Sequence, residues 1–220
     1  MTVPVQPKIY HIVHVDRLQS IITDGYLWCE AEVFRRTPPG TTIGMNSIKQ
    51  RRLNELTLTC YPQLACRQDY VPFYFCPSSV MLYLIAQRNH PELAYRGGQG
   101  AIIHLEADLH ASVAWAQTYH KRWAFTLSNA GSYFFEDRCR LDQLHEINWE
   151  AVQTNRWSGN GVEASVKEGK QAEFLMEYSF PWQLIERIGV YSRPMYQQTV
   201  NVLPNNGHRP RIELRPEWYY

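Results

Sequence analysis

Hydrophobic and polar residues alternate with short, changing periods along this chain, and they predict strands and helices that follow one another without strict alternation. Residues 8–14 are β-branched and aromatic without helical spacing, which is typical of a short strand. Asp16 is positioned to cap a helix through residues 17–22, and Gly25 to end it. The polar stretch 35–42 contains two prolines and a glycine, so it predicts a loop.

The middle of the chain carries two further helical patterns. Apolar positions within residues 45–58 favour a helix that also carries Lys49, Arg51 and Arg52. Residues 70–75 predict a strand, in which Pro72 indicates a sheet edge or a bulge. Ser78 or Ser79 would then cap a helix over residues 80–88, with Met81, Leu84 and Ile85 facing inward.

The second half predicts further short elements and a tail. Its patterns indicate strands over 101–105, 170–180 and 188–191, an aromatic strand or loop over 123–127, a helix over 109–116, and a helical or irregular stretch over 141–149. The stretch after Leu203, residues 204–220, carries Pro and Arg and is expected to be loosely ordered. The pattern as a whole favours an α+β fold in a single domain, residues 1–220.

Composition excludes several classes of protein. The formal net charge of +1 gives no general basic field, so any contact with nucleic acid would depend on local patches such as Arg35-Arg36 or Lys121-Arg122. The five cysteines, an odd number, lack the spacing of a disulfide framework or a zinc site, and we expect no metal. No apolar run reaches the length of a membrane helix, so we expect a soluble, cytoplasmic protein that does not engage a membrane.

Glu173 is the residue that most needs a chemical explanation. It stands at the entry of the apolar stretch Phe174-Leu175-Met176, where a carboxylate must be solvated at a strand end, paired with a cation or used in chemistry. A strand-end glutamate is the ordinary reading of such a residue. Other chemistries lack their motifs, because the chain contains no Gly-x-Ser-x-Gly nucleophile elbow, no phosphate loop after Gly97–Gly100 and no dinucleotide fingerprint.

A histidine in the first strand, tyrosines near a middle strand and a glutamate opening a late strand resemble the three elements of the ADP-ribosyltransferase superfamily. More closely, several segments in this order are similar to the DarT family, toxins that ADP-ribosylate DNA bases in single strands. The segments are Tyr10-His11-Ile12-Val13-His14, Ile43-Gly44 with Lys49 to Arg52, Val71 to Phe75 with Met81-Leu82-Tyr83, and Gln171-Ala172-Glu173-Phe174-Leu175 with Pro181-Trp182. The resemblance implies an ADP-ribosyltransferase-like fold with central mixed or antiparallel sheets, and NAD as the ADP-ribose donor.

The resemblance also implies roles for individual residues. Glu173 would stabilise the positive charge that develops on the nicotinamide ribose and would orient the nucleophile. His11 would bind the adenine-side ribose, and the backbone of Ile12-Val13, which replaces the usual Gly-Ser or Gly-Thr, would hold the carboxamide. The remaining NAD contacts would come from Gly44, Asn46, Arg51, Tyr74 and Tyr83, of which the two tyrosines would stack on the nicotinamide. His14 is expected to be a core histidine.

Candidate DNA contacts come from two stretches. Arg51 and Arg52 lie on the segment that in DarT proteins folds over NAD, and we favour Arg51 for catalysis and Arg52 for DNA. Tyr119-His120-Lys121-Arg122 mixes cations with rings, as single-strand binding requires, although the same composition suits a surface turn.

We expect a monomer, and the resemblance implies control by a DarG-like macrodomain antitoxin. Thymidine is the implied acceptor base, with guanosine as the rival. Two other functions remain open at this point. The first is an ADP-ribosyltransferase that acts on protein or RNA, and the second is a non-catalytic NAD-sensing module in which Glu173 is structural.

Overall fold

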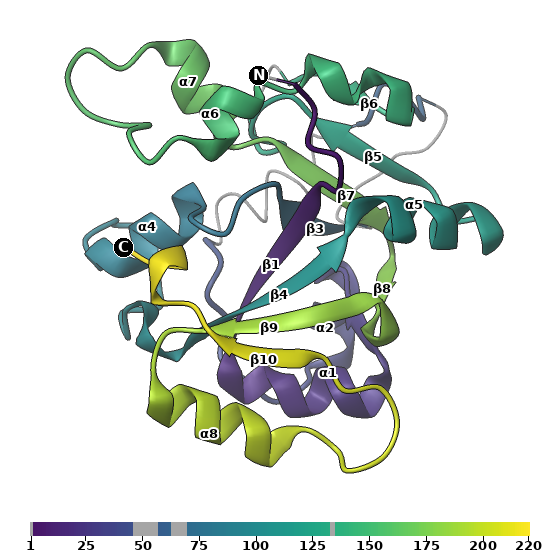
Figure 1. Ribbon diagram of the computed structural model, residues 1–220, viewed down its shortest axis with the longest axis vertical. Helices are drawn as coiled ribbons and strands as arrows, with labels where there is room; N and C mark the ends of the chain where they lie inside the picture. The colour runs from purple at the N-terminus through teal and green to yellow at the C-terminus, as the bar shows by residue number, and fades with distance from the viewer. Residues whose placement is uncertain (1, 46–56, 63–69, 133–134) are drawn as a thin grey trace.

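The computed structural model describes residues 2–45, 57–62, 70–132 and 135–220, and a large β-sheet runs through its centre. Within these ranges, eight strands form one sheet in the order β10-β9-β4-β1-β3-β7-β5-β6 (Figure 1). Neighbouring strands run antiparallel except β9 and β10, which run parallel. Helices flank this mostly antiparallel sheet, which confirms the mixed fold class expected from the sequence.

The elements are short, as the changing hydrophobic periods predict. The strands are β1 (Lys8–His14), β2 (Tyr26–Trp28), β3 (Tyr70–Tyr74), β4 (Ile102–Asp108), β5 (Trp123–Thr126), β6 (Asp137–Arg138), β7 (Glu173–Glu177), β8 (Ser179–Pro181), β9 (Ile185–Val190) and β10 (Arg211–Leu214). The α-helices are α1 (Leu18–Asp24), α2 (Glu30–Arg36), α4 (Val80–Gln87), α5 (Leu109–Thr118), α6 (Trp149–Gln153), α7 (Ala164–Gly169) and α8 (Arg193–Val202). Short 3₁₀ turns are η1 (Val15–Arg17), η2 (Gln99–Ala101), η3 (Leu141–Glu146), η4 (Trp182–Leu184) and η5 (Pro216–Trp218). No helix of the described part is long and apolar enough to span a bilayer.

Local signals place the helices beside the pocket. The Ser79 hydroxyl accepts a hydrogen bond from the Leu82 N–H and caps α4, as predicted. Gly25 ends α1 in the left-handed region at φ 73°, a conformation that costs glycine little. Asp16 does not cap α1, because its carboxylate instead binds Thr41 in a distant loop. Helix α2 extends two residues into the stretch predicted as a loop.

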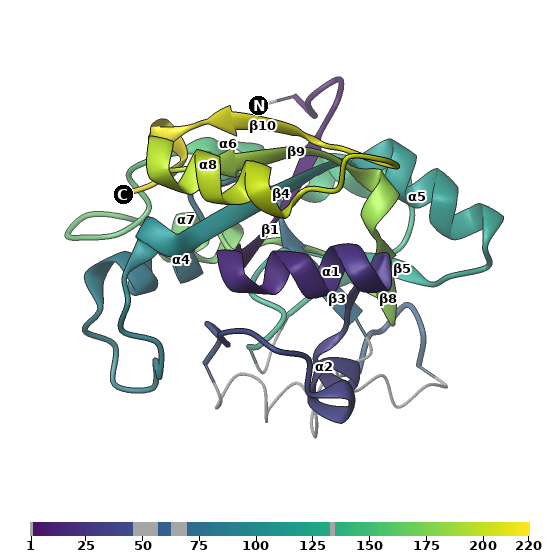
Figure 2. The same cartoon turned by 90° about the horizontal axis from the view of Figure 1, so that it is seen from below.

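The core lies on both faces of β1. Ile9 and Val13 are buried in a large cluster with Leu18 and Ile21 of α1, whereas Ile12 is buried in a second cluster with Leu82 of α4. This alternation follows from the two-residue period of a strand. Helices α1 and α8 lie side by side and cover the face of the sheet that carries Ile9 and Val13 (Figure 2).

The C-terminal segment is ordered, so the expectation of a loose tail over 204–220 is wrong. Strand β10 pairs with β9, and Trp218 and Tyr219 are each only 9% exposed. The Tyr219 hydroxyl donates to the Ile102 carbonyl at 2.7 Å. Gly189 lets the Trp218 ring lie directly on β9, since a Cβ at this position would come within 2.2 Å of the ring. The order comes from non-local pairing, which the composition of the tail does not reveal.

Candidate functional site

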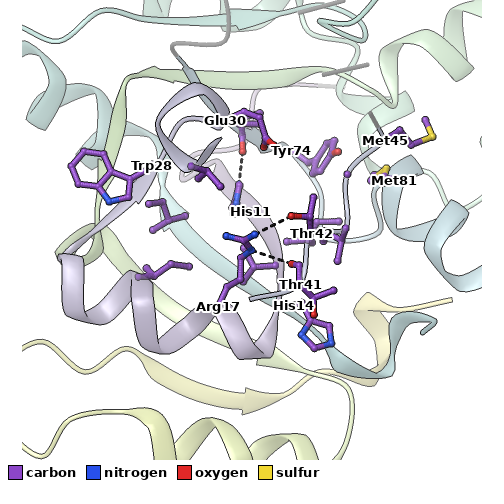
Figure 3. A pocket seen from close by; sticks show the side chains of 18 of the residues that line it. His11, His14, Arg17, Trp28, Glu30, Thr41, Thr42, Met45, Tyr74 and Met81 are labelled. Atoms are coloured by element: carbon purple, nitrogen blue, oxygen red, sulfur yellow. Dashed lines mark hydrogen bonds between the residues drawn. The ribbon is translucent and has the colours of Figure 1, made fainter. Parts of the chain in front are cut away.

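A pocket of about 310 Å³ lies between β1, β3, α1, the segment 38–45 and the start of β7 (Figure 3). This volume falls in the range of small-molecule sites. Six of the residues that the sequence assigned to the site line the pocket together, although they come from four separate parts of the chain: His11, Ile12, Val13, Gly44, Tyr74 and Glu173.

The pocket exists because β1 and β3 separate. Within the described chain, their register contains a single partner pair, Tyr10 with Tyr74. Pro72 contributes to this separation, since it has no N–H to offer β1. Its carbonyl instead accepts a hydrogen bond from the His11 ring, 2.7 Å from Nδ1. The sequence predicted that Pro72 marks an edge strand or a bulge. This is wrong, because β3 is a central strand between β1 and β7. The sheet tolerates the proline there because Pro72 faces the gap between β1 and β3.

His11 is held in one tautomer by this contact. A carbonyl can only accept, so Nδ1 carries the proton and Nε2 remains the basic nitrogen of the neutral ring. Burial lowers the pKa of His11, and the Pro72 carbonyl and the negative charge of Glu30 oppose that shift. Figure 3 shows the Glu30 carboxylate facing the His11 ring. Figure 3 draws a hydrogen bond between this carboxylate and the ring, so a ribose hydroxyl would bind to the His11–Glu30 pair.

Glu173 opens β7 at the edge of the same pocket. It is 3% exposed, and its backbone N–H donates to the Thr126 hydroxyl at 3.1 Å. In the β3–β7 ladder it is the partner of Tyr74, which brings the carboxylate and the phenol ring to the pocket side by side. Just before it in the chain, Gln171 accepts a hydrogen bond from the Asn129 amide at 3.0 Å, and both residues line the pocket.

Asp16 and Arg17 fasten one wall of the pocket. The Asp16 carboxylate accepts from the Thr41 N–H at 2.9 Å and from its hydroxyl at 2.7 Å. Arg17 donates to the Thr41 carbonyl at 3.0 Å and to the Thr42 hydroxyl at 2.9 Å (Figure 3). Burial would raise the pKa of Asp16, but the hydrogen bonds from Thr41 and His14 hold it below its usual value. We call residues 38–45 the strap, since these contacts tie it to the start of α1.

Two expectations about single residues change with the structure. His14 is not a fully buried core histidine; it lines the pocket, and its Nδ1 lies 2.9 Å from Asp16 Oδ1. Tyr83 does not line the pocket, because its ring packs edge-on against Trp157 and Tyr220 at 5.1 and 5.2 Å. A linear motif places Tyr83 on α4 correctly but does not tell which side of the helix it occupies.

The stretch expected to bind DNA lies outside the pocket lining. Tyr119 is exposed and packs on Trp115 at 4.7 Å, and His120 adopts a positive φ of 52° at the end of α5. Arg122 binds Glu177 with its guanidinium and with its own N–H, so it serves at least to fasten β5 to β7. Lys121 Nζ lies 5.8 Å from the Tyr178 ring.

Asn46, Arg51 and Arg52 lie outside the described residues, so their expected roles stay predictions. Within the described ranges no group of three or more metal-binding side chains occurs. Sequence reasoning missed Arg17, Trp28 and Glu30, which line the pocket. No motif in the sequence marks these three residues, because they come together only when β1, α1 and β2 fold.

Comparisons with known proteins find relatives over nearly the whole chain. The family model described as ssDNA thymidine ADP-ribosyltransferase, DarT, matches residues 10–220. A DNA ADP-ribosyl transferase from Thermus sp. strain 2.9 is 37% identical, over 100% of this chain and 99% of its own length. The solved structure of Thermus sp. 2.9 DarT in complex with ADP-ribosylated ssDNA superposes with a TM-score of 0.86 at 33% identity, covering 100% of this chain and 99% of that one. Its complex with NAD⁺ superposes with a TM-score of 0.80, also at 33% identity, and both chains are covered completely.

Proposed function

Because this chain belongs to the DarT family of single-stranded DNA thymidine ADP-ribosyltransferases, we propose that its pocket binds NAD and transfers ADP-ribose from it to thymidine. The observation that carries the proposal is Glu173, a 3% exposed carboxylate that opens β7 and lines the pocket with His11 and Tyr74. An oxocarbenium-like transition state develops positive charge on the ribose, and a carboxylate held in a site of low dielectric stabilises it strongly.

The residues of the pocket fit such a donor. His11, together with Glu30, would bind the adenine-side ribose, and the Ile12 and Val13 backbone would bind the carboxamide. The Tyr74 ring offers a flat face to the nicotinamide, and Gly44 on the strap lets the backbone approach the donor closely. Tyr83 is not part of this proposal, since its ring packs away from the pocket.

The proposed reaction is a substitution at the nicotinamide ribose carbon. The bond from C1′ to the pyridinium nitrogen breaks, and its electron pair leaves with nicotinamide, which becomes neutral. The new bond to C1′ forms from a thymine ring nitrogen. N3 is the ring nitrogen of thymidine that carries a proton, and the Glu173 carboxylate would accept that proton as the bond forms. Glu173 would stabilise the developing charge and orient the thymine, and Asn129 and Gln171 border the same space.

We propose Arg51 as a catalytic residue that neutralises the pyrophosphate of NAD or steers the base into line for attack, and Arg52 as a DNA contact. Both lie outside the described residues. We expect Arg51→Ala to lose more transfer activity than Arg52→Ala while it keeps measurable NAD affinity. Equal and mild losses would remove both from the site.

The proposed biological role is that of a toxin with a cognate partner. An enzyme that modifies thymidine harms the DNA of its own cell, so we propose a DarG-like macrodomain antitoxin that removes the ADP-ribose. We propose that the enzyme acts as a monomer. Expression of the wild-type protein without such a partner should be toxic, and Glu173→Ala should be tolerated.

The test combines acceptor choice with one variant. The protein is incubated with NAD and single-stranded oligonucleotides that contain either one thymidine or guanosine without thymidine, and digested products are analysed by mass. We expect ADP-ribose on thymidine, and none with Glu173→Ala. Duplex DNA should react poorly, because freeing the base costs a few kcal/mol. Modification of guanosine, RNA or protein in place of thymidine would overturn the acceptor, and NAD binding without nicotinamide release would overturn the enzyme.

A further inference from the structure

A cluster of rings continues from the pocket to the surface. Strand β2 pairs with β8, and this pairing brings Trp28 beside the turn that carries Tyr178. The Trp28 ring lies 5.3 Å from Tyr26 and 5.7 Å from Tyr178. We call these three residues the aromatic platform. Tyr26 and Trp28 also line the pocket, where Figure 3 shows Trp28 at the end opposite Met45 and Met81.

Cations accompany the aromatic platform. The Arg36 guanidinium stacks 3.9 Å above the Trp28 ring, and Lys121 Nζ lies 5.8 Å from the Tyr178 ring. Arg35 and Arg36 both pair with the single carboxylate of Glu32, and Trp28 Nε1 donates to the Asp24 carboxylate at 2.7 Å. With Lys121 counted, three cations face two carboxylates here, which leaves one positive charge in excess. Flat rings combined with cations are what proteins use to hold single-stranded nucleic acid, since rings stack on bases and cations neutralise phosphates.

Tyr178 adopts an uncommon backbone conformation for a tyrosine. It lies between β7 and β8 at φ 63°, in the left-handed region, where glycine or asparagine would be less strained. Its side chain is 39% exposed. The ring packs edge-on against Trp28 and leaves its remaining surface open to solvent, so a positive φ is maintained at a partly exposed tyrosine.

We propose that the aromatic platform, with Arg36 and Lys121, stacks the bases of the DNA strand that flank the reacting thymidine. This inference rests on the proposed function. The distance is suitable, because Tyr178 comes five residues after Glu173 along β7, or roughly 17 Å at the rise of a strand. A strand with its thymidine at Glu173 reaches the platform within a few nucleotides. Of the stretch Tyr119–Arg122, which the sequence predicted to bind DNA, Lys121 is the residue that we then expect to contact the strand, because its Nζ lies near the Tyr178 ring.

The experiment replaces Tyr178 by Asn, which tolerates the left-handed conformation, and by Phe, which keeps the ring. Transfer is measured against the concentration of an oligonucleotide with one thymidine and long flanks. Loss of one stacked base corresponds to roughly a tenfold loss of affinity. We therefore expect Tyr178→Asn to raise the KM for DNA about tenfold and Tyr178→Phe to restore it. The KM for NAD and the slow hydrolysis of NAD without DNA should not change.

A matched control is Tyr196→Asn on α8, since Tyr196 is also 39% exposed and does not line the pocket. It should leave the KM for DNA unchanged. Lys121→Gln should flatten the salt dependence of DNA binding, measured with the unreactive analogue carba-NAD present.

Each other outcome has a definite meaning. If the wild-type protein does not modify single-stranded DNA, the proposed function fails. If it does, and Tyr178→Asn keeps the wild-type KM for DNA, only the platform fails. If Tyr178→Asn raised the KM for NAD, the rings would belong to the NAD site and the proposal would be overturned. It would also be overturned if Tyr178→Asn weakened binding to a protein partner and left the DNA kinetics unchanged.

Discussion

Strand β1 has two neighbours, and it pairs with them very differently. Towards β4, all seven residues of β1 have a partner in the register. Towards β3, the described residues provide a single partner pair, and the ring of His11 lies where further ladder hydrogen bonds would otherwise form. The same strand is therefore fully paired on one side, and on the other side it forms the wall of a binding pocket. We call the boundary between two neighbouring strands a seam, closed where they pair and open where they do not. The contrast teaches that this site was formed by leaving part of a sheet unpaired.

Two histidines repeat the contrast. His11 and His104 each have one ring nitrogen close to a proline carbonyl, at 2.7 and 3.0 Å. His104 is sealed by Trp218 and Tyr219, whose rings lie 5.4 and 4.8 Å away. His11 instead faces the pocket and Glu30. The same local arrangement is thus structural on the closed side and available to a ligand on the open side.

The largest expected effect is at the open side. We expect Glu173→Gln to lower the transfer rate about a thousandfold, because the amide cannot stabilise developing positive charge. The variant keeps the shape of the side chain, so its urea midpoint should match that of the wild type. Nicotinamide release and oligonucleotide modification measure the rate. If Glu173→Gln kept most of its activity, Glu173 would not be catalytic.

The next prediction uses neighbouring positions of β3. Because the Pro72 carbonyl faces His11, the backbone of Val71 faces β7, where the ladder is continuous. Val71→Pro should therefore lower the free energy of unfolding by about 3 kcal/mol or more, since it removes a ladder donor. Pro72→Ala should change it by less than about 1 kcal/mol, because the added N–H faces the opening. Equal losses in urea unfolding would mean that the seam between β1 and β3 is not open.

A pH experiment separates the two sides further. Burial lowers the pKa of His104 to about 4, with the Pro77 carbonyl opposing the shift. Between pH 6.5, the ordinary value, and about 4, the unfolded chain binds a proton that the folded chain does not. Stability is thus complete above about pH 6.5 and falls by up to roughly 3 kcal/mol as the pH decreases to 4. His104→Gln, compared with the wild type by urea unfolding at several pH values, should lack this part of the fall, and an unchanged slope would contradict it.

The smallest expected effect concerns the strap. Asp16→Ala removes two hydrogen bonds to Thr41, each worth about 1 kcal/mol or less at an exposed position. We expect the KM for NAD to rise about fivefold with little change in kcat, because the pocket wall must be ordered on binding. Asp142→Ala is the control, since its exposed pair with Arg140 is outside the pocket lining. A fall in kcat alone would assign Asp16 to the chemical step instead.

Local signals gave much of the fold. The β-branched run of β1, the Ser79 cap of α4 and the glycine that ends α1 each depend on neighbouring residues alone, so the sequence contains them. The order of β10 does not, because it depends on pairing with β9. Gly189 gives no hint of its role until the Trp218 ring is placed on it.

The site divides in the same way. His11, Tyr74 and Glu173 were found through the order of short motifs, and the structure brings them into one pocket. Trp28 and Glu30 were missed, since their position depends on how β2 crosses to β8. Tyr83 shows the limit of a motif read along the chain, because helix α4 turns its ring to Trp157. The roles of these residues await the variants described above.

The unequal seams of β1 also divide the sheet mechanically. Strands β10-β9-β4-β1 form one plate and β3-β7-β5-β6 form the other, and the seam between β1 and β3 is the compliant joint. The small β2–β8 sheet ties residues that follow β1 to residues that follow β7, so it limits how far the plates can spread. Bending is therefore concentrated at the pocket, and a bound molecule that bridges the two plates would stiffen the protein as a whole.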